Sequence, residues 1–298
     1  MKKLAIIGPT ASGKSDLALR LAKKHDAYIL SIDSLAIYKE FDIVSAKPSP
    51  KELQEVRHFG VDEIEPTATF NVEKFLQLYQ KAKKLAEYDQ KNLIIVGGTG
   101  FYLKMLIDGI SKLPLISKSV QNQIKKELRD LGNAYERLLA IDPTFARKIA
   151  KNDRYRIEKG LGIYYATSLP PSRYFEQNPP IRIDTLPIYE IAIDRETLRS
   201  RIAQRTRKMI KKGLIDEIAI LEKKYGRAIQ PMKAIGVVET LKFLDGTIKS
   251  SDELAQKIST HTAQLAKRQQ TFNKTQFQSR YSMPIEELEK KLDEELAD

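Results

Sequence analysis

Cysteine is absent from the 298-residue sequence, and histidine occurs only three times. The lack of cysteine excludes disulfide bonds, thiolate zinc sites, iron–sulfur clusters and cysteine nucleophiles. The histidines, His25, His58 and His261, lie far apart and do not have the spacing of metal ligands. A bound metal is therefore expected to be a hard, oxygen-liganded cation such as Mg²⁺.

Long apolar runs are also absent from the sequence. No stretch approaches the length of about 20 residues that a membrane-spanning helix needs, so we expect no membrane association. The chain begins Met-Lys-Lys and then enters a short apolar segment, which argues against a cleaved signal. We therefore expect a cytoplasmic protein.

The composition is that of an ordinary globular protein, with 42% hydrophobic and 30% charged residues. The length exceeds the about 100 to 200 residues of a typical domain, so a large domain with an insertion and two smaller domains are both open. The formal net charge is +12. This excess favours a polyanionic partner such as nucleic acid, although solvated Lys/Glu-rich helices explain it equally well.

The most specific motif follows the first apolar segment. Residues 8–15 read Gly-Pro-Thr-Ala-Ser-Gly-Lys-Ser and are followed by an amphipathic helical pattern. Such a strand-to-helix turn aims backbone amides and a helix N-terminus at phosphate oxygens. We predict that the diphosphate-binding residues are Gly8, Thr10, Ala11, Ser12, Gly13, Lys14 and Ser15. Lys14 supplies a mobile cation and Ser15 a hydroxyl ligand for Mg²⁺, but the motif does not distinguish ATP, GTP and an isoprenyl diphosphate.

Four short apolar segments alternate with helical patterns, at residues 4–7, 27–32, 93–96 and 188–193. They predict an α/β fold, a P-loop NTPase-like parallel sheet flanked by helices. Residues 114–186 carry helical patterns between proline-marked ends, without a strand pattern. We interpret them as an inserted helical domain, with residues 1–113 and 187–298 forming the P-loop catalytic core. Long loops and crossover helices of one domain are the alternative.

Further helices are predicted after the last strand. The pattern favours a helix that begins near Arg195 and stops at Gly213. Other helical stretches are expected at residues 215–225, 237–244, 251–273 and 285–298. The last of these is acidic with regularly spaced leucines, and we assign it no chemistry.

Asp33 ends the second predicted strand. The carboxyl ends of parallel strands meet at one edge of the sheet, so this carboxylate is expected to face the bound phosphate. It can serve as a magnesium anchor, as a general base beside the diphosphate, or as the cap of the following turn. Residues 97–100, Gly-Gly-Thr-Gly, follow the third strand at the same edge, where a requirement for positive φ alone would explain the glycines.

Together, these motifs resemble those of the bacterial tRNA dimethylallyltransferases, also called isopentenyl-diphosphate:tRNA transferases. The matching segments run in order through nearly the whole chain, at residues 8–15, 31–34, 46–48, 96–102 and 266–269. The resemblance implies transfer of a dimethylallyl group from dimethylallyl diphosphate to the exocyclic amine of the adenosine 3′ of the anticodon. It also implies a P-loop core with a helical insertion and a channel that joins two openings.

By this resemblance the catalytic residues are Asp33, Thr10 and Arg205. An adenine amine is a poor nucleophile because its lone pair is delocalised, so Asp33 is expected to act as the base. Arg205, the loop amides, Lys14 and Mg²⁺ at Ser15 would stabilise the charge that develops on the departing diphosphate.

The implied partners are dimethylallyl diphosphate and the tRNA anticodon stem-loop, and we expect a monomer. The target adenosine must leave its stack to reach a buried site, so neighbouring residues are expected to hold it. The expected tRNA-binding residues are Asp33, Ser34, Leu35, Ala36, Thr99, Arg156, Lys159, Lys267, Arg268 and Gln269. For any single lysine or arginine among them, a solvated basic helix face is the alternative.

Three segments depart from the family pattern. Residues 159–162 read Lys-Gly-Leu-Gly where relatives usually carry arginine followed by Ala-Leu-Glu. Residues 233–238 read Lys-Ala-Ile-Gly-Val-Val where relatives often have Arg-Ala-Ile-Gly-Tyr and a basic residue, and Phe272 replaces a tryptophan. These changes lie in the expected tRNA-facing layer, so they concern RNA recognition more than the reaction.

Two other functions are compatible with a P-loop. The first is a small-molecule kinase that uses ATP, or a prenyltransferase that acts on a free adenine nucleotide. The second is a noncatalytic RNA-binding protein. The helical insertion and the basic segment at residues 267–269 count against the kinase, which needs no RNA surface.

Overall fold

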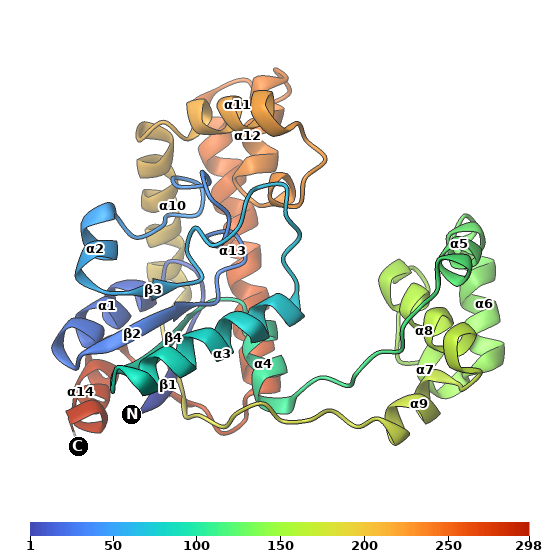
Figure 1. Ribbon diagram of the computed structural model, residues 1–298. Coiled ribbons are helices and arrows are strands. Elements are labelled where there is room, and N and C mark those ends of the chain that lie inside the picture. The colour runs from blue at the N-terminus through green and yellow to red at the C-terminus, as the bar shows by residue number, and fades with distance from the viewer. Residues whose placement is uncertain (298) are drawn as a thin grey trace. The chain divides into compact units, whose positions relative to one another are not determined.

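The computed structural model of the protein describes residues 1–297. The chain forms two compact units (Figure 1). The larger unit contains Met1–Met105 and the chain from Thr185 onward, and the second unit contains Leu106–Asp184. Within the described residues, no helix combines the length and apolarity needed to cross a bilayer.

The larger unit is built on a six-stranded sheet in which all neighbouring strands are parallel. The strand order is β3 (His58–Phe59), β2 (Ala27–Ser31), β4 (Asn92–Gly97), β1 (Lys3–Ile7), β5 (Ile188–Ile191) and β6 (Tyr281–Met283). The predicted parallel sheet is confirmed. The edge strands β3 and β6 were not predicted, because two or three residues are too few to show an alternating pattern.

The order of the strands brings three loops to one edge of the sheet. β4 lies between β2 and β1, and each pair is in parallel register over five residues. The carboxyl ends of β1, β4 and β2 therefore carry the phosphate loop, the Gly97 turn and Asp33 side by side. The sheet itself thus assembles the predicted site from segments far apart in the sequence.

In the larger unit, the helices after β5 follow the predicted pattern closely. The helices of this unit are α1 (Lys14–Lys24), α2 (Pro50–Glu55), α3 (Val72–Tyr88), α4 (Gly100–Asp108), whose last turn belongs to the second unit, α10 (Arg195–Lys211), α11 (Leu214–Tyr225), the short 3₁₀ helix η1 (Gln230–Lys233), α12 (Val237–Leu244), α13 (Ser251–Gln276) and α14 (Ile285–Ala297). α10 ends just before Gly213, whose φ of 101° no other residue type adopts without strain. The helix predicted at residues 285–298 is confirmed up to Ala297, and residue 298 lies outside the described residues.

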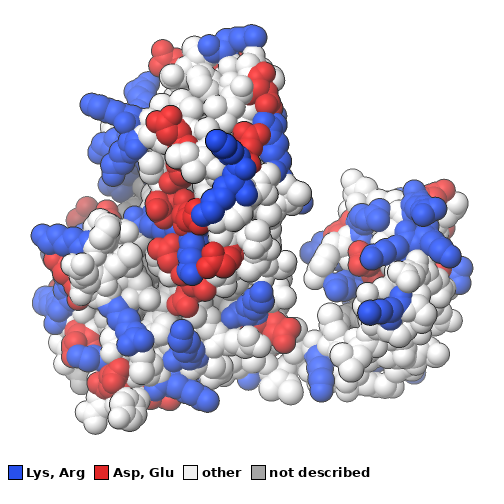
Figure 2. All heavy atoms as spheres, turned by 45° about the horizontal axis from the view of Figure 1, so that its top comes forward, with Lys and Arg blue, Asp and Glu red and all other residues white. Residues whose placement is uncertain are grey.

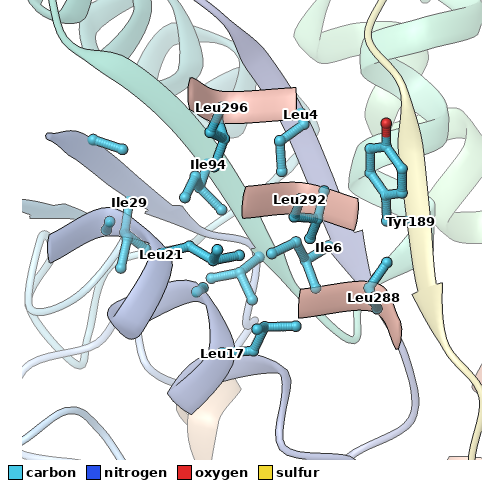
Figure 3. Close-up of a cluster of buried hydrophobic side chains, with 14 of the residues drawn as sticks. Leu4, Ile6, Leu17, Leu21, Ile29, Ile94, Tyr189, Leu288, Leu292 and Leu296 are labelled. Atoms are coloured by element: carbon cyan, nitrogen blue, oxygen red, sulfur yellow. The ribbon is translucent and has the colours of Figure 1, made fainter. Parts of the chain in front are cut away.

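The acidic C-terminal helix, α14, completes the core on the α1 side of the sheet. Its buried residues Leu288, Leu292 and Leu296 recur every four positions and so form one face. Figure 3 shows these leucines beside Leu17 of α1 and Ile6 of β1, in a single buried cluster. The role of α14 is therefore packing.

The second unit is helical and has its own core. Its helices are α5 (Lys118–Glu127), α6 (Leu131–Ile141), α7 (Pro143–Ala146), α8 (Arg154–Thr167) and α9 (Pro171–Gln177). Ile124, Leu138 and Leu161 are buried together between them. α8 packs closely at Gly160, where a Cβ atom would lie 2.9 Å from Phe145 and 3.0 Å from Leu138.

Candidate active site

The phosphate loop joins β1 to α1 through two left-handed residues. Ala11 has a φ of 64° and Gly13 a φ of 93°. α1 then begins at Lys14, and no side chain caps its first amides. Uncapped N–H groups at a helix N-terminus form a ready site for an anion. The loop therefore leaves the first amides of α1 without a side-chain partner, as an anion-binding turn requires.

Two helices tie this loop down. From α13, Gln269 Oε1 accepts a hydrogen bond from the Thr10 backbone N–H at 2.9 Å. From α10, Arg205 Nη1 donates to Thr10 Oγ1 at 3.2 Å and Arg201 Nη1 donates to the Ser12 carbonyl at 3.1 Å. α10 and α13 also pack on each other through Leu198, Ile202 and Ala266, with Ala11 of the loop against them. The start of the loop is therefore held from two sides.

The side chain of Lys14 has a lowered pKa. Its Nζ donates to the Pro9 carbonyl at 3.2 Å. Burial, and next the positive charge of Arg205, lower the pKa of Lys14 to about 8, while Asp33 opposes the shift. Burial also lowers the pKa of Arg205. Two desolvated cations side by side make this a site that an anion would stabilise.

Asp33 is the second residue after β2, and within the described residues one of its carboxylate oxygens accepts hydrogen bonds while the other does not. Its Oδ1 accepts hydrogen bonds from the backbone amides of Leu35 at 2.8 Å and Ala36 at 3.2 Å. Among residues 1–297, none donates a hydrogen bond to Oδ2. The carboxylate therefore does cap the following turn, and the same contacts orient its second oxygen for other chemistry.

A cavity of about 150 Å³ brings the predicted chemical groups together. Asp33, Thr10, Lys14, Ser15 and Arg205 all line it. A second cavity of about 920 Å³ shares Lys14, Ser15 and Arg205 with the first and continues past Arg201 and Lys208 of α10. Its lining combines basic residues with the acidic residues Asp16, Asp42, Glu52 and Asp62.

The glycines at the end of β4 allow close approach of other segments. A Cβ atom at Gly97 would lie 2.6 Å from the Ile32 side chain, and one at Gly98 would lie 2.3 Å from Gln269 Nε2. Gly97 also has a φ of 158°, a conformation that residues with side chains rarely adopt, so both the backbone and the packing explain its type. Thr99 follows, half-buried, beside the same helix.

The residues around the loop fit a magnesium ion that is held mainly by phosphate oxygens and water. Among the described residues, no group of three or more histidine and acidic side chains is arranged to hold a metal. Mg²⁺ in phosphate sites needs only one or two protein oxygens, because phosphate oxygens and water complete its shell. The exposed Ser15 hydroxyl, with Asp16 lining the same cavity, can supply them.

The residues expected to bind RNA differ in exposure. Ser34, Lys267 and Arg268 are exposed, Leu35 is half-buried, and Ala36 is only 5% exposed. Lys267 and Arg268 have no ion-pair partner within the part of the chain that the structure describes. Gln269, next to them, instead faces the phosphate loop.

The other two expected RNA-binding residues lie on α8 of the second unit. Arg156 pairs with Asp153 at the start of that helix. Lys159 Nζ lies 5.5 Å from the centre of the Tyr155 ring, and Tyr155 is 68% exposed. On the face of the larger unit shown in Figure 2, acidic side chains lie among basic ones, so net charge alone does not locate an RNA surface there.

Comparison with known proteins agrees with this geometry. A model of a family described as "IPP transferase" matches residues 36–276. The chain belongs to the IPP transferase family. A relative from Sulfurimonas denitrificans, named tRNA dimethylallyltransferase, is 54% identical over 97% of this chain and 97% of its own.

Two solved structures of the IPP transferase family extend the comparison to the fold. A tRNA isopentenylpyrophosphate transferase from Staphylococcus epidermidis has a TM-score of 0.69 at 32% identity, covering 100% of this chain and 98% of its own. A eukaryotic dimethylallyltransferase described as acting on tRNA has a TM-score of 0.84 at 25% identity, covering 96% of this chain and 74% of its own. The family membership predicted from the motifs is confirmed.

Sequence reasoning missed two residues that shape the site of this IPP transferase. Arg201 lies one helical turn before Arg205, so its spacing on α10 was the available signal. Glu217 of α11 had no such signal. Its carboxylate accepts hydrogen bonds at 2.7–3.0 Å from three successive backbone amides, those of Asp42, Ile43 and Val44.

The loop that Glu217 orders also carries the Ala-Lys-Pro motif. Lys47 Nζ is buried, and it pairs with Asp42 at 2.7 Å and Asp62 at 2.6 Å. The neighbouring Ser45 carbonyl accepts a hydrogen bond of 3.5 Å from Arg205. The motif therefore helps to hold this loop against the arginine that faces the phosphate loop.

Proposed function

We propose that this chain transfers a dimethylallyl group from dimethylallyl diphosphate to the exocyclic amine of the adenosine 3′-adjacent to the anticodon in tRNA. The observation that carries the proposal is the single cavity lined by Asp33, Lys14 and Arg205. It lies in a chain whose relatives are named tRNA dimethylallyltransferase. A structurally similar protein is described as acting on tRNA, which favours an RNA substrate over a free nucleotide.

In this proposal the phosphate loop binds the diphosphate. Amides between Ala11 and Lys14, at the N-terminus of α1, would face its oxygens, and Lys14 and Arg205 would neutralise charge that accumulates as the group departs. A magnesium ion held by Ser15 and the diphosphate would add further charge neutralisation. Because the loop is fixed before the ligand binds, little reorganisation accompanies the reaction.

Asp33 acts as the general base. Its Oδ1 is held by two backbone amides, so Oδ2 has a fixed direction from which it can take a proton. As the exocyclic nitrogen forms a bond to the allylic carbon, the bond from that carbon to the diphosphate oxygen breaks. The amine proton passes to Asp33, and the diphosphate leaves with the bonding electron pair.

The RNA is proposed to meet both units of the protein. Near Asp33, Ser34, Leu35 and Thr99 would hold the extruded adenosine and its neighbours, while Lys267 and Arg268 would contact phosphates. The helical segment 114–186, through Arg156 and Lys159, would contact the anticodon stem-loop. We propose that the protein acts as a monomer in the cytoplasm.

A product assay tests the proposal. The protein is incubated with dimethylallyl diphosphate, Mg²⁺ and an anticodon stem-loop that carries three consecutive adenosines, and nucleosides are analysed by mass spectrometry. We expect one added dimethylallyl group, on the adenosine 3′ of the anticodon. A parallel reaction with AMP as the acceptor should yield no prenylated nucleotide. Another with ATP in place of dimethylallyl diphosphate should yield no modified acceptor. Modification of AMP alone would assign the chain to the free-nucleotide alternative.

A further inference from the structure

Gln269 is turned away from the basic residues beside it. Lys267 and Arg268 are exposed, whereas Gln269 is half-buried and its Oε1 accepts the Thr10 N–H at 2.9 Å. Residues one or two positions apart on a helix point in different directions, so an RNA contact at 267 and 268 does not extend to 269. The function of Gln269 therefore needs an explanation that is separate from RNA binding.

The other end of the Gln269 amide fills a space that only glycine leaves. A Cβ atom at Gly98 would lie 2.3 Å from Gln269 Nε2 and 3.1 Å from its Cδ. The amide is therefore wedged between the phosphate loop and the glycine turn after β4. These two turns end neighbouring strands, and Gln269 joins them from α13.

The hydrogen bond from Thr10 to Gln269 affects the conformation of the phosphate loop because of where Thr10 lies in it. Thr10 precedes Ala11, which holds a left-handed conformation that is unfavourable for a residue with a side chain. Such conformations persist where neighbouring contacts determine them. Gln269 fixes the Thr10 main chain and Arg205 its hydroxyl, so the two contacts together set where the following amides point.

We infer that Gln269 is a positioning residue for the diphosphate loop and that it does not read the RNA. Its acceptor oxygen is already used by the Thr10 amide, and its Nε2 occupies space that a side chain at position 98 would need. The inference rests on the proposed function only for the identity of the ligand. It reassigns a residue that the sequence grouped with the RNA contacts.

The main test replaces the acceptor while keeping the volume of the side chain. Gln269→Met removes the hydrogen bond to Thr10 and keeps an unbranched chain against Gly98. Affinity for inorganic diphosphate with Mg²⁺ should fall about three- to tenfold, the effect of one lost hydrogen bond. Affinity for the anticodon stem-loop, measured without diphosphate, should stay within twofold of wild type.

A second variant displaces Gln269 without changing it. In Gly98→Ala, the new methyl group would occupy the place of Nε2, so the flexible amide must move and release Thr10. The same loss of diphosphate affinity is expected. The double variant should bind diphosphate no more weakly than the weaker-binding of the two single variants, because both substitutions remove the same contact.

Gln270→Ala is the matched control. Gln270 is also half-buried on α13, but it lines a different groove, with Lys267 and Arg199. Diphosphate affinity of this variant should equal that of the wild type, and circular dichroism should show that all variants are folded. If Gln269→Met instead weakens RNA binding and spares diphosphate, or changes neither affinity, the inference is wrong.

The design separates this inference from the proposed function. Both affinities are measured without turnover, so they do not depend on which acceptor is prenylated. A wild-type protein that binds diphosphate but forms no modified RNA would overturn the proposed function and leave the assignment of Gln269 intact. Under the proposed function, the variants should also show a raised KM for dimethylallyl diphosphate with an unchanged KM for RNA.

Discussion

The phosphate loop is built differently from the expected RNA-contacting residues Lys267 and Arg268, which directly precede its partner Gln269 on α13. In the loop, Thr10 and Ser12 are tied by three side chains from α10 and α13. Lys267 and Arg268 are exposed and have no ion-pair partner among residues 1–297. The proposed diphosphate site is therefore organised before a ligand arrives, whereas the proposed RNA surface would make its contacts only on binding.

This contrast follows from what each ligand requires. A small leaving group gains most from donors that are already fixed where its charge will develop. An RNA backbone is long and flexible, and mobile cations neutralise it by releasing counterions. Substitutions in the loop should therefore change the chemistry and diphosphate binding, and substitutions on the exposed side of α13 should change the response to salt.

The largest effect is expected from Asp33→Asn. The amide oxygen can still accept the Leu35 and Ala36 N–H groups, so the turn is preserved while the base is lost. The rate of prenyl transfer should fall by about 10²- to 10⁴-fold, the usual contribution of a general base. Single-turnover kinetics measures this fall, and filter binding should show unchanged RNA affinity. A variant that keeps a tenth of the rate would mean that another group takes the proton.

The next effect concerns Lys14 and its titration. Lys14→Ala should weaken binding of inorganic diphosphate about 10- to 100-fold, as expected for a lost charged hydrogen bond. Because the pKa of Lys14 is about 8, the side chain is charged below that pH and neutral above it. Diphosphate affinity of the wild type should therefore decrease as the pH rises through 8. Calorimetric titration from pH 7 to pH 9.5 measures the trend.

Lys14→Arg is the control for this pH dependence. Its guanidinium stays charged throughout the range, so its pH profile contains only the ionisation of diphosphate itself, and the wild-type affinity should fall relative to it as the pH rises. A wild-type profile that runs parallel to that of Lys14→Arg would show that Lys14 does not titrate near 8. The loop would then be less desolvated than its burial indicates.

A smaller effect is expected from Lys267→Ala and Arg268→Ala. Each should weaken binding of the anticodon stem-loop only a few-fold and lower the slope of log affinity against log salt by up to about one. Diphosphate affinity should not change. Lys290→Ala on α14, also exposed, is the charge-matched control and should leave the slope as it is. If the slope of log affinity against log salt is unchanged in both α13 variants, these two cations do not contact the RNA.

The sequence predicted the parts of the site that local patterns encode. The phosphate loop, the strand before Asp33 and the glycine turn have strong signals, because each depends on residues next to one another. The contacts of Gln269 and Glu217 depend instead on which helix packs where. Nothing near position 217 indicates that its carboxylate will bind three amides around Ile43, so only the tertiary structure shows it.

The departures from the family pattern illustrate the same limit. The family comparison assigns residues 159–162 to the expected RNA-facing layer, and Lys159 is half-buried. Gly160 and Gly162, however, are buried in the second unit, where Gly160 touches Leu138 and Gly162 approaches Ile116. Their small size is explained by packing within that unit, and no RNA contact is needed to account for it.

The smallest effect tests this packing explanation through Gly160→Ala. Alanine favours the helix by nearly 1 kcal/mol, but its methyl group would overlap Phe145 and Leu138, at a cost of about 1–3 kcal/mol. We expect a net loss of about 1 kcal/mol in the opening free energy of α8, measured by amide hydrogen exchange of the full chain. Gly132→Ala on α6 is the matched control, because its methyl group would make only one ordinary contact, to Asp130. It should leave exchange unchanged or slow it slightly. If the amides of α8 exchange equally slowly in Gly160→Ala and in the wild type, α8 has room for alanine. Close packing of the interior face of α8, as opposed to its proposed RNA-facing outer face, would then no longer explain the glycines of this helix.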